Sequence, residues 1–343
     1  MQQTQTVLPR WRGFNLLEMF TSRSDGNFQE DDFRWMAEWG FDFARIPMCY
    51  LLWIENGDVF KIHEPMLEKV DRVVQLGQRY GIHICLNFHR APGYSVNRER
   101  TEPFDLWKDA EALEAFCFHW ALFARRYRGI PSTQLSFNPV NEPAHVSRAD
   151  HERVIRAAVQ AIREVDPDRL IIADGLDYGR TPCPELADLG IAQSCRAYDP
   201  MGVSHYKAPW VGGENWPEPT WPGDFFDGRW DRARLEQCYA PWADLARRGV
   251  GVHCGEGGAF NHTPHDVFLR WLRDVLEILT AHGIGYALWN FRGPFGVLDS
   301  ERQDVAYEDW HGHRLDRRLL NLLQERSRPD LWEGGQGYDL AGC

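Results

Sequence analysis

The 343-residue sequence lacks any run of about 18 to 20 consecutive apolar residues, the length that a membrane-spanning helix requires, so no membrane partner is expected. It also lacks a stripe of Lys and Arg. The 38 basic residues stand against 50 acidic ones, and the resulting net charge of −12 is spread along the chain. Because nucleic-acid surfaces need clustered positive charge, no nucleic-acid partner is expected either.

Two further absences bear on the cellular compartment. The first residues, MQQTQTVLPRWRG, have neither the basic start nor the apolar core of a secretory signal. The eight Cys show no regular spacing, and Cys85 and Cys254 stand inside apolar runs, where a reduced and buried thiol is expected. These features favour a cytoplasmic protein. A secreted protein is expected instead if a leader has been removed from this form.

Tryptophan, in contrast, is abundant, with 15 copies, and aromatic residues make up 13% of the sequence. Most of these rings are expected to fill the core. Several Trp stand in loops rich in Pro and Gly, where core packing explains them less well. Flat rings on a cleft wall suit the apolar faces of sugar rings, so some of these Trp are candidates for carbohydrate contact.

Short apolar runs alternate with longer amphipathic segments along the chain, without an internal repeat or a linker. Most of the runs are continuous, as expected for parallel strands that are covered on both sides. The eight predicted strands span residues 13–17, 41–47, 82–88, 135–140, 170–173, 202–205, 250–255 and 286–290.

Helical periodicity fills the gaps between these runs. Apolar residues at spacings of one, three and four from Val267 to Leu279 predict one amphipathic helix, and a second follows Asp150 and ends at Asp166-Pro167. Further helices are predicted at about 31–39, 65–80, 109–127, 232–247 and 315–324.

Eight strands alternating with helices predict either a closed barrel or an open doubly wound sheet. No Gly-rich dinucleotide fingerprint follows the first strand, where a Rossmann fold would place one. We therefore predict an α/β protein of the (β/α)8 TIM-barrel class. The whole chain, 1–343, is expected to form one catalytic domain, with its core at about 12–326 and short extensions at both ends.

Polar residues recur where the predicted strands end, which is where barrels of this class carry their chemistry. The second, third, fourth, sixth, seventh and eighth strands close with Arg45, His89-Arg90, Asn141-Glu142-Pro143, His205-Tyr206, Glu256 and Trp289-Asn290. The Glu on the fourth and seventh strands converge across the barrel mouth. Glycosidic bond cleavage needs such a pair: one carboxyl to protonate the leaving oxygen and one carboxylate to face the anomeric carbon.

The run from Phe137 to Pro143, FNPVNEP, resembles the Asn-Glu-Pro motif of the clan A glycoside hydrolases, and most closely glycoside hydrolase family 5, the cellulase family. Arg45, His89, Glu256 and Trp289 match that family's pattern in order. The resemblance extends from Arg12 to about Arg326. It implies a retaining mechanism, no metal and no organic cofactor.

Carried over residue by residue, the resemblance implies that Glu142 is the acid/base and Glu256 the nucleophile. Asn141 would bind the sugar 2-OH, and Arg45 would hold Glu256 ionised. His89 and His205 would orient the sugar and the carboxylates, and Trp289 would form the floor of the subsite before the scissile bond. The family usually has His, any residue, then Tyr at the sixth strand. The predicted sixth strand instead leads into His205-Tyr206-Lys207, so the spacing is broken, and Tyr206 is a candidate for the Tyr role.

The loop from Lys207 to Trp230 is long and rich in Pro and Gly, and loops of this length are commonly functional. Its four Trp, at 210, 216, 221 and 230, either pin the loop or bind sugar, and Trp210 and Trp216 are the predicted sugar contacts. Trp53 and Trp107, after the second and third strands, are candidates of the same kind.

Three alternatives stay open. A metal-dependent hydrolase on the same barrel would want a His-any-His pair at the first strand, which is absent, and the Cys and other His lack zinc-ligand spacing. The second alternative is a carbohydrate-binding barrel that has lost catalysis. The third concerns the kind of enzyme: an endo-β-1,4-glucanase is favoured over an exo-acting β-glucosidase or β-mannosidase and over an endo-mannanase. The expected partner is a β-linked oligo- or polysaccharide, bound by a monomer or small homo-oligomer.

Overall fold

The computed structural model describes residues 6–97 and 101–325, and their central feature is a closed parallel barrel. Each strand pairs in parallel with the next one round, and β2 pairs with β5 to close the ring. The eight barrel strands are β1 (Arg12–Asn15), β2 (Phe43–Cys49), β5 (His83–Ala91), β7 (Leu135–Asn138), β8 (Leu170–Asp174), β9 (Ala192–Ala197), β12 (Val252–Gly257) and β13 (Gly285–Leu288). The predicted (β/α)8 fold is confirmed.

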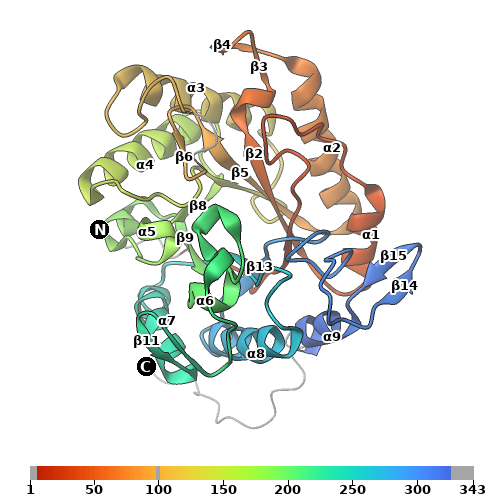
Figure 1. Cartoon of the computed structure of the whole chain (residues 1–343). Coiled ribbons are helices and arrows are strands. Elements are labelled where there is room, and N and C mark those ends of the chain that lie inside the picture. The colour runs from red at the N-terminus through yellow and green to blue at the C-terminus, as the bar shows by residue number, and fades with distance from the viewer. Residues whose placement is uncertain (1–5, 98–100, 326–343) are drawn as a thin grey trace, which may run out of the picture.

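Helices surround the strands (Figure 1). The longer ones are α1 (Glu30–Glu38), α2 (Glu64–Tyr80), α3 (Ala110–Arg126), α4 (Arg148–Arg163), α7 (Arg232–Arg247), α8 (His265–Ala281) and α9 (Arg317–Glu325). These helices agree with the predicted ones to within a few residues at each end. The apolar stripe of α8 explains why: from Val267 to Leu279 its members are buried against the barrel, so periodicity and burial report the same face.

The predicted sixth strand at 202–205 is wrong. That segment is the short helix α6 (Met201–Ser204), and the sixth barrel strand is β9. Two features hide β9 in the sequence. Only the one-turn α5 (Leu176–Gly179) and the 3₁₀ turn η2 (Pro184–Leu189) separate it from β8. The sequence before β9 therefore lacks the amphipathic helix that precedes most other barrel strands. Its polar side chains are also buried, which breaks the continuous apolar run expected of a barrel strand.

Small elements decorate the loops. Three 3₁₀ turns and seven short strands follow barrel strands in the chain. The turns are η1 (Tyr50–Leu52), η3 (Pro209–Val211) and η4 (Gly213–Asn215). The strands are β3 (Ile54–Glu55), β4 (Asp58–Ile62), β6 (Tyr94–Ser95), β10 (Gly223–Phe225), β11 (Gly228–Trp230), β14 (Glu308–Trp310) and β15 (His313–Leu315). Of these, β6 adds to the end of β5 by a hairpin and so reaches the rim of the barrel.

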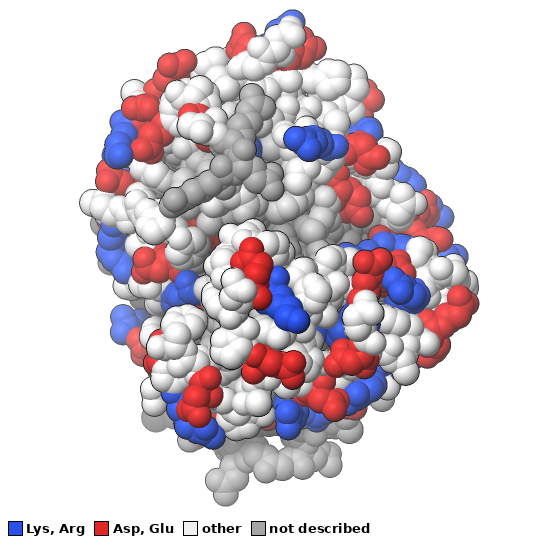
Figure 2. All heavy atoms as spheres, in the orientation of Figure 1, with Lys and Arg blue, Asp and Glu red and all other residues white. Residues whose placement is uncertain are grey.

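Acidic and basic side chains are interspersed on the face shown in Figure 2, and neither sign gathers into a stripe there. In the part of the chain that the structure describes, no helix combines the length and the apolar character needed to cross a bilayer. The seven described Cys, including Cys85 and Cys254, are free thiols.

Candidate active site

Glu256 lies near the end of β12, where the strand is locally irregular. The pairing register between β12 and β9 shifts between Cys254 and Glu256, so Gly255 forms a bulge. Bulges of this kind redirect the following side chain. A Cβ at Gly255 would come within 2.6 Å of the Ser194 hydroxyl, which explains why glycine stands there. The side chain of Glu256 is only 4% exposed.

Arg45, at the middle of β2, neutralises Glu256. Its Nη1 donates to Oε1 of Glu256 at 2.6 Å. Three Asn oxygens take the remaining directions of the guanidinium: Asn138 accepts from Nε at 2.9 Å, Asn15 from Nη1 at 3.0 Å and Asn141 from Nη2 at 2.7 Å. A buried guanidinium held by four hydrogen bonds is rigid, and it stabilises the negative form of the carboxylate beside it.

Glu142 adopts a left-handed backbone conformation, with φ of 46°, directly before Pro143. Two hydrogen bonds hold this uncommon geometry. The Glu142 N–H donates to Oδ2 of Asp174 at 2.9 Å, and the Tyr94 hydroxyl donates to the Glu142 carbonyl at 2.7 Å. Strained backbone persists where its surroundings fix it and is concentrated at functional sites. Here the strain aims the Glu142 side chain into the barrel mouth.

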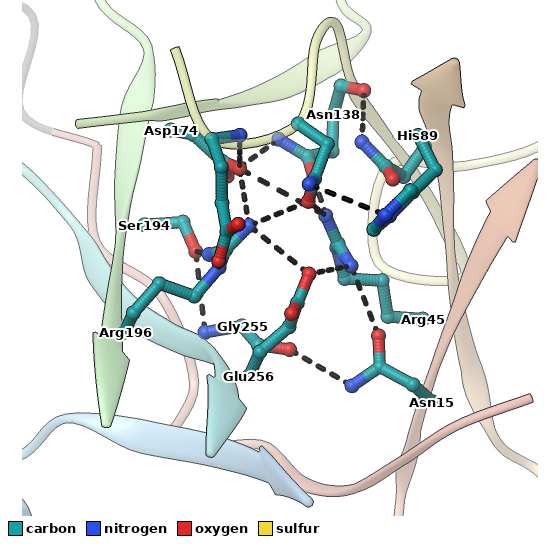
Figure 3. Close-up of polar contacts among 12 residues, drawn as sticks. Asn15, Arg45, His89, Asn138, Asp174, Ser194, Arg196, Gly255 and Glu256 are labelled. Carbon is teal, nitrogen blue, oxygen red and sulfur yellow. Dashed lines mark hydrogen bonds and ion pairs between the residues drawn. The ribbon is translucent and has the colours of Figure 1, made fainter. Parts of the chain in front are cut away.

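Arg196, on β9, joins the two carboxylates. Its Nε donates to Oε1 of Glu142 at 3.1 Å, and its Nη2 lies 3.3 Å from Oε1 of Glu256. The same Nη2 donates to Asn141 Oδ1 at 3.0 Å and forms a short ion pair with Asp174. Figure 3 shows Arg196 and Arg45 facing Glu256 from two sides. One guanidinium thus contacts both Glu side chains.

The two carboxyls are in different electrostatic settings. Burial raises the pKa of Glu142 to about 8, and the nearby Glu256 carboxylate adds to the effect, while Arg196 opposes it. Glu142 therefore holds its proton near neutral pH. Glu256 has the short ion pair with Arg45, which favours the charged form. An acid and a carboxylate face the same space, the arrangement that acetal hydrolysis requires.

The Tyr beside Glu256 is Tyr198, directly after β9. Its hydroxyl donates to Oε2 of Glu256 at 3.2 Å. With β9 as the true sixth strand, the run is Arg196-Ala197-Tyr198, so the spacing to the Tyr is kept and Arg replaces His. Tyr206, the candidate that the sequence offered for this role, is buried beside Lys207, and no described contact links it to Glu256.

The rings of His89 and Trp289 lie beside each other. Their rings are 5.5 Å apart, and the half-buried Phe20 contacts both. Nε2 of His89 lies 3.5 Å from the Asn141 amide nitrogen. Burial and the nearby Arg45 and Arg196 cations lower the pKa of His89 well below its ordinary value, so the ring is neutral.

His205, although not on a strand, reaches the pocket through Tyr198, whose ring lies 5.1 Å away. Burial lowers the pKa of His205 to about 4, and Ser204 Oγ lies 2.7 Å from its Nδ1. Trp210 continues the row at 6.0 Å from His205 and is 57% exposed. An aromatic row therefore leads from Glu256 to an open Trp.

The other loop Trp divide into two kinds. Trp221 and Trp230 are buried, and their indole N–H groups donate to Asp274 and Asp227, so they pin the loop. Trp216 is half-buried beside the exposed Phe226. Trp53 and Trp107 belong to the core and are not open surfaces.

Sequence reasoning missed five residues of this network: Asn15, Asn138, Asp174, Arg196 and Tyr198. Asp174 directly follows the predicted fifth strand at 170–173, the same signal that identified Arg45 and Glu256, so it could have been found. Asn15 and Asn138 lie inside predicted strands, where the ends of those strands gave no signal. The last two were hidden by the misplaced sixth strand.

A second polar cluster contains residue types that can bind a metal ion. Among residues 6–97 and 101–325, His151, Cys183 and Glu185 offer ligand atoms that all lie within 4.8 Å of one another. Both carboxylate oxygens of Glu185 accept from Nη1 of Arg148 at 2.7 Å. The charge of Glu185 is therefore balanced by a cation of the protein itself.

Comparison with known proteins agrees with this geometry. The chain matches the family described as Cellulase (glycosyl hydrolase family 5) over residues 2–293. Endoglucanase C of Acetivibrio thermocellus is 24% identical over 324 residues, which cover 87% of this chain and 91% of that protein. Cellodextrinase A of Ruminococcus flavefaciens is 25% identical over 277 residues, covering 76% of this chain and 78% of that one.

A solved structure described as a glycoside hydrolase is 41% identical, with a TM-score of 0.88, and covers 92% of this chain and 99% of its own. The barrel and its pair of carboxyls thus define a glycoside hydrolase. The chain belongs to glycosyl hydrolase family 5, the cellulase family.

Proposed function

We propose that the protein is a retaining β-glycoside hydrolase that cleaves β-linked glucans and gluco-oligosaccharides, acting as an endo-β-1,4-glucanase. The observation that carries this proposal is the pair formed by Glu142 and Glu256, a protonated and an ionised carboxyl that contact Nε and Nη2 of the same guanidinium, that of Arg196. Retaining enzymes hold their carboxyl groups about 5–5.5 Å apart, close enough for direct attack on the sugar.

In the first step, Glu142 gives its proton to the glycosidic oxygen while a Glu256 oxygen attacks the anomeric carbon. The bond to the leaving sugar breaks, and a glycosyl ester forms on Glu256. Arg45 and Tyr198 hold the two Glu256 oxygens, so the carboxylate is oriented before the substrate arrives.

In the second step, Glu142 is ionised and takes a proton from water, which attacks the anomeric carbon of the ester. Glu256 leaves as a carboxylate, and Glu142 regains its proton. Two inversions at one carbon give a product with the configuration of the substrate. We assign binding of the sugar 2-OH to Asn141, whose Oδ1 accepts from both Arg45 and Arg196.

Two observations support internal cleavage of a chain. The relative from Acetivibrio thermocellus named above is called an endoglucanase. The exposed Trp210 ends the aromatic row that starts at Glu256, and it offers a surface for a sugar beyond the reacting one. Trp289 and His89 form a second aromatic group, beside Asn141.

Hydrolysis of cellohexaose followed by proton NMR tests both parts of the proposal. We expect the β-anomer of the new reducing end to appear first, and fragments of intermediate length to precede glucose. On carboxymethylcellulose, viscosity should fall faster than reducing ends appear. An initial α-anomer would contradict retention, and stepwise release of glucose or preferential cleavage of mannan would contradict the β-1,4-glucanase assignment.

A further inference from the structure

We propose that Arg196 and Asp174 form a positioning pair that keeps the buried charge of the pocket balanced while negative charge passes from Glu256 to Glu142. The inference rests on the proposed function, because it assigns those two Glu the roles of nucleophile and acid/base. It concerns the position at which this chain carries Arg where the family pattern has His.

The contacts of Arg196 are those of a fixed cation. Its side chain is only 2% exposed. Nη1 donates to Ser194 Oγ at 2.9 Å and to the Cys195 carbonyl at 3.1 Å. These bonds anchor one end of the guanidinium, so that Nε and Nη2 are left for the acidic side chains. Burial disfavours the cation, but the three surrounding carboxyl groups, led by that of Asp174, hold the pKa of Arg196 well above its ordinary value.

The charge count of the pocket explains the need for this cation. Two guanidiniums, Arg45 and Arg196, face Asp174, Glu256 and Glu142. With Glu142 protonated, two positive charges meet two negative ones. After the first step Glu256 is a neutral ester and Glu142 is a carboxylate, so the sum is still zero. An uncompensated buried charge would be costly, and neither state contains one.

Arg196 is placed to follow the moving charge. Its Nη2 is 3.3 Å from Glu256 Oε1, and its Nε is 3.1 Å from Glu142 Oε1. Before the first step its positive charge stabilises the carboxylate of Glu256, and afterwards it stabilises the carboxylate of Glu142. No side chain needs to move for this exchange. A neutral His could not supply a permanent cation to both sites.

Asp174 prevents this cation from ionising Glu142 too early. It accepts from Arg196 Nη2 and from the Glu142 backbone N–H. Without Asp174 the two guanidiniums would face one carboxylate, and the excess positive charge would draw the proton from Glu142. Without Arg196 the excess would be negative, and Glu142 would hold its proton more tightly. The two substitutions therefore have opposite effects on one group.

Other groups near Glu142 do not alter these signs. Tyr94, on β6, and Tyr198 are neutral phenols, since burial raises the pKa of each. Arg180 is engaged by Asp199 through two hydrogen bonds of 2.8 and 2.9 Å. Arg45 remains in both substitutions and is held by its Asn partners and Glu256.

The test is the alkaline limb of kcat/KM for Arg196→Gln and Asp174→Asn, measured with an aryl β-cellobioside whose leaving group needs protonation. We expect the limb to move up in Arg196→Gln and down in Asp174→Asn, each by about 1–3 pH units. Arg196→Lys should restore part of the wild-type position. Arg180→Gln removes a cation whose guanidinium donates its two hydrogen bonds to Asp199 and which acts on Glu142 only through its charge, so it should move the limb less.

Melting temperatures and circular dichroism of each variant show whether it is folded. Where a folded variant turns over too slowly for a profile, carboxyl ¹³C NMR of Glu142 gives the same pKa directly. Shifts of the same sign, or no shift in both variants, would overturn the charge-balancing role while wild-type retention still supports the proposed function. Inversion or absence of turnover in the wild type would overturn the proposed function itself.

Discussion

The Tyr198 hydroxyl donates to Oε2 of Glu256 at 3.2 Å, so the proposed nucleophile is held on the oxygen that Arg45 leaves free. The two contacts come from opposite sides of the barrel, β9 and β2. Glu256 is therefore fixed in orientation as well as in charge. When the ester is hydrolysed in the second step, the Tyr198 hydroxyl can again donate a hydrogen bond to the Glu256 carboxylate.

Tyr198→Phe should lower kcat by about 10- to 100-fold, because a hydrogen bond to a charged group contributes about 1.5–3 kcal/mol. Steady-state kinetics on an aryl cellobioside measures the change. Tyr206→Phe is the matched control, since Tyr206 has no described contact with the pocket. Equal losses in the two variants would count against the position assigned to Tyr198.

The pH profile should report Glu142. Its pKa is raised to about 8, and the acid must hold a proton to assist departure of the leaving sugar. Activity should therefore be retained through neutral pH and fall tenfold per pH unit above about 8. In Glu142→Gln, the alkaline limb should be absent from the pH profile of the residual hydrolysis of an activated substrate. An alkaline limb that persists in this variant would show that another group causes it.

The same shift predicts a pH-dependent effect on stability. The folded pKa of Glu142 lies above the ordinary 4.5, so the folded state keeps a proton that the unfolded state releases. That stabilisation is complete below about pH 4.5 and is lost as pH rises to about 8. Glu142→Gln cannot ionise, so its melting temperature relative to wild type should increase across this range.

Glu256→Gln is the contrast for that measurement, because it removes the closest carboxylate partner of the buried Arg45. Such a loss is typically destabilising by about 3–5 kcal/mol. We expect its melting temperature to fall at every pH in the range. A parallel response of the two variants would contradict the opposite charge states assigned to the two Glu.

Trp210→Ala should raise KM for cellohexaose several-fold more than for a short aryl glucoside, since we assign the exposed ring to a sugar beyond the reacting one. Trp221→Ala is the control. Its ring is buried, and truncation of such a residue costs about 3–5 kcal/mol, so it should lower the melting temperature and affect all substrates alike. Equal effects of Trp210→Ala on both substrates would remove the sugar platform.

Most of the barrel could be predicted because its parallel strands are covered on both faces and read as apolar runs, while helices such as α8 show their buried stripe directly. Strand β9 could not be found this way. Its inward side chains, Ser194 and Arg196, serve the site rather than the core, and no regular helix precedes it. A functional requirement thus overrode the local pattern at the point where the site departs from its family.

The loop Trp show a second limit. Trp210 and Trp230 stand in the same kind of Pro/Gly-rich sequence, yet one is exposed and the other is buried against Asp227 and Arg234. Composition predicts that a ring is present in the loop. Only tertiary packing decides which face of the molecule it meets.

The most direct test of the proposed mechanism is covalent trapping with a 2-deoxy-2-fluoro β-cellobiosyl fluoride, which forms the glycosyl ester quickly and hydrolyses it slowly. Mass spectrometry of the inactivated protein and its peptides locates the label. We predict one sugar per chain, attached to Glu256, with none in Glu256→Gln. Inactivation with the label on Glu142, or turnover of cellohexaose without any trapped ester, would contradict the assignment of Glu256 as the nucleophile of a retaining glycoside hydrolase.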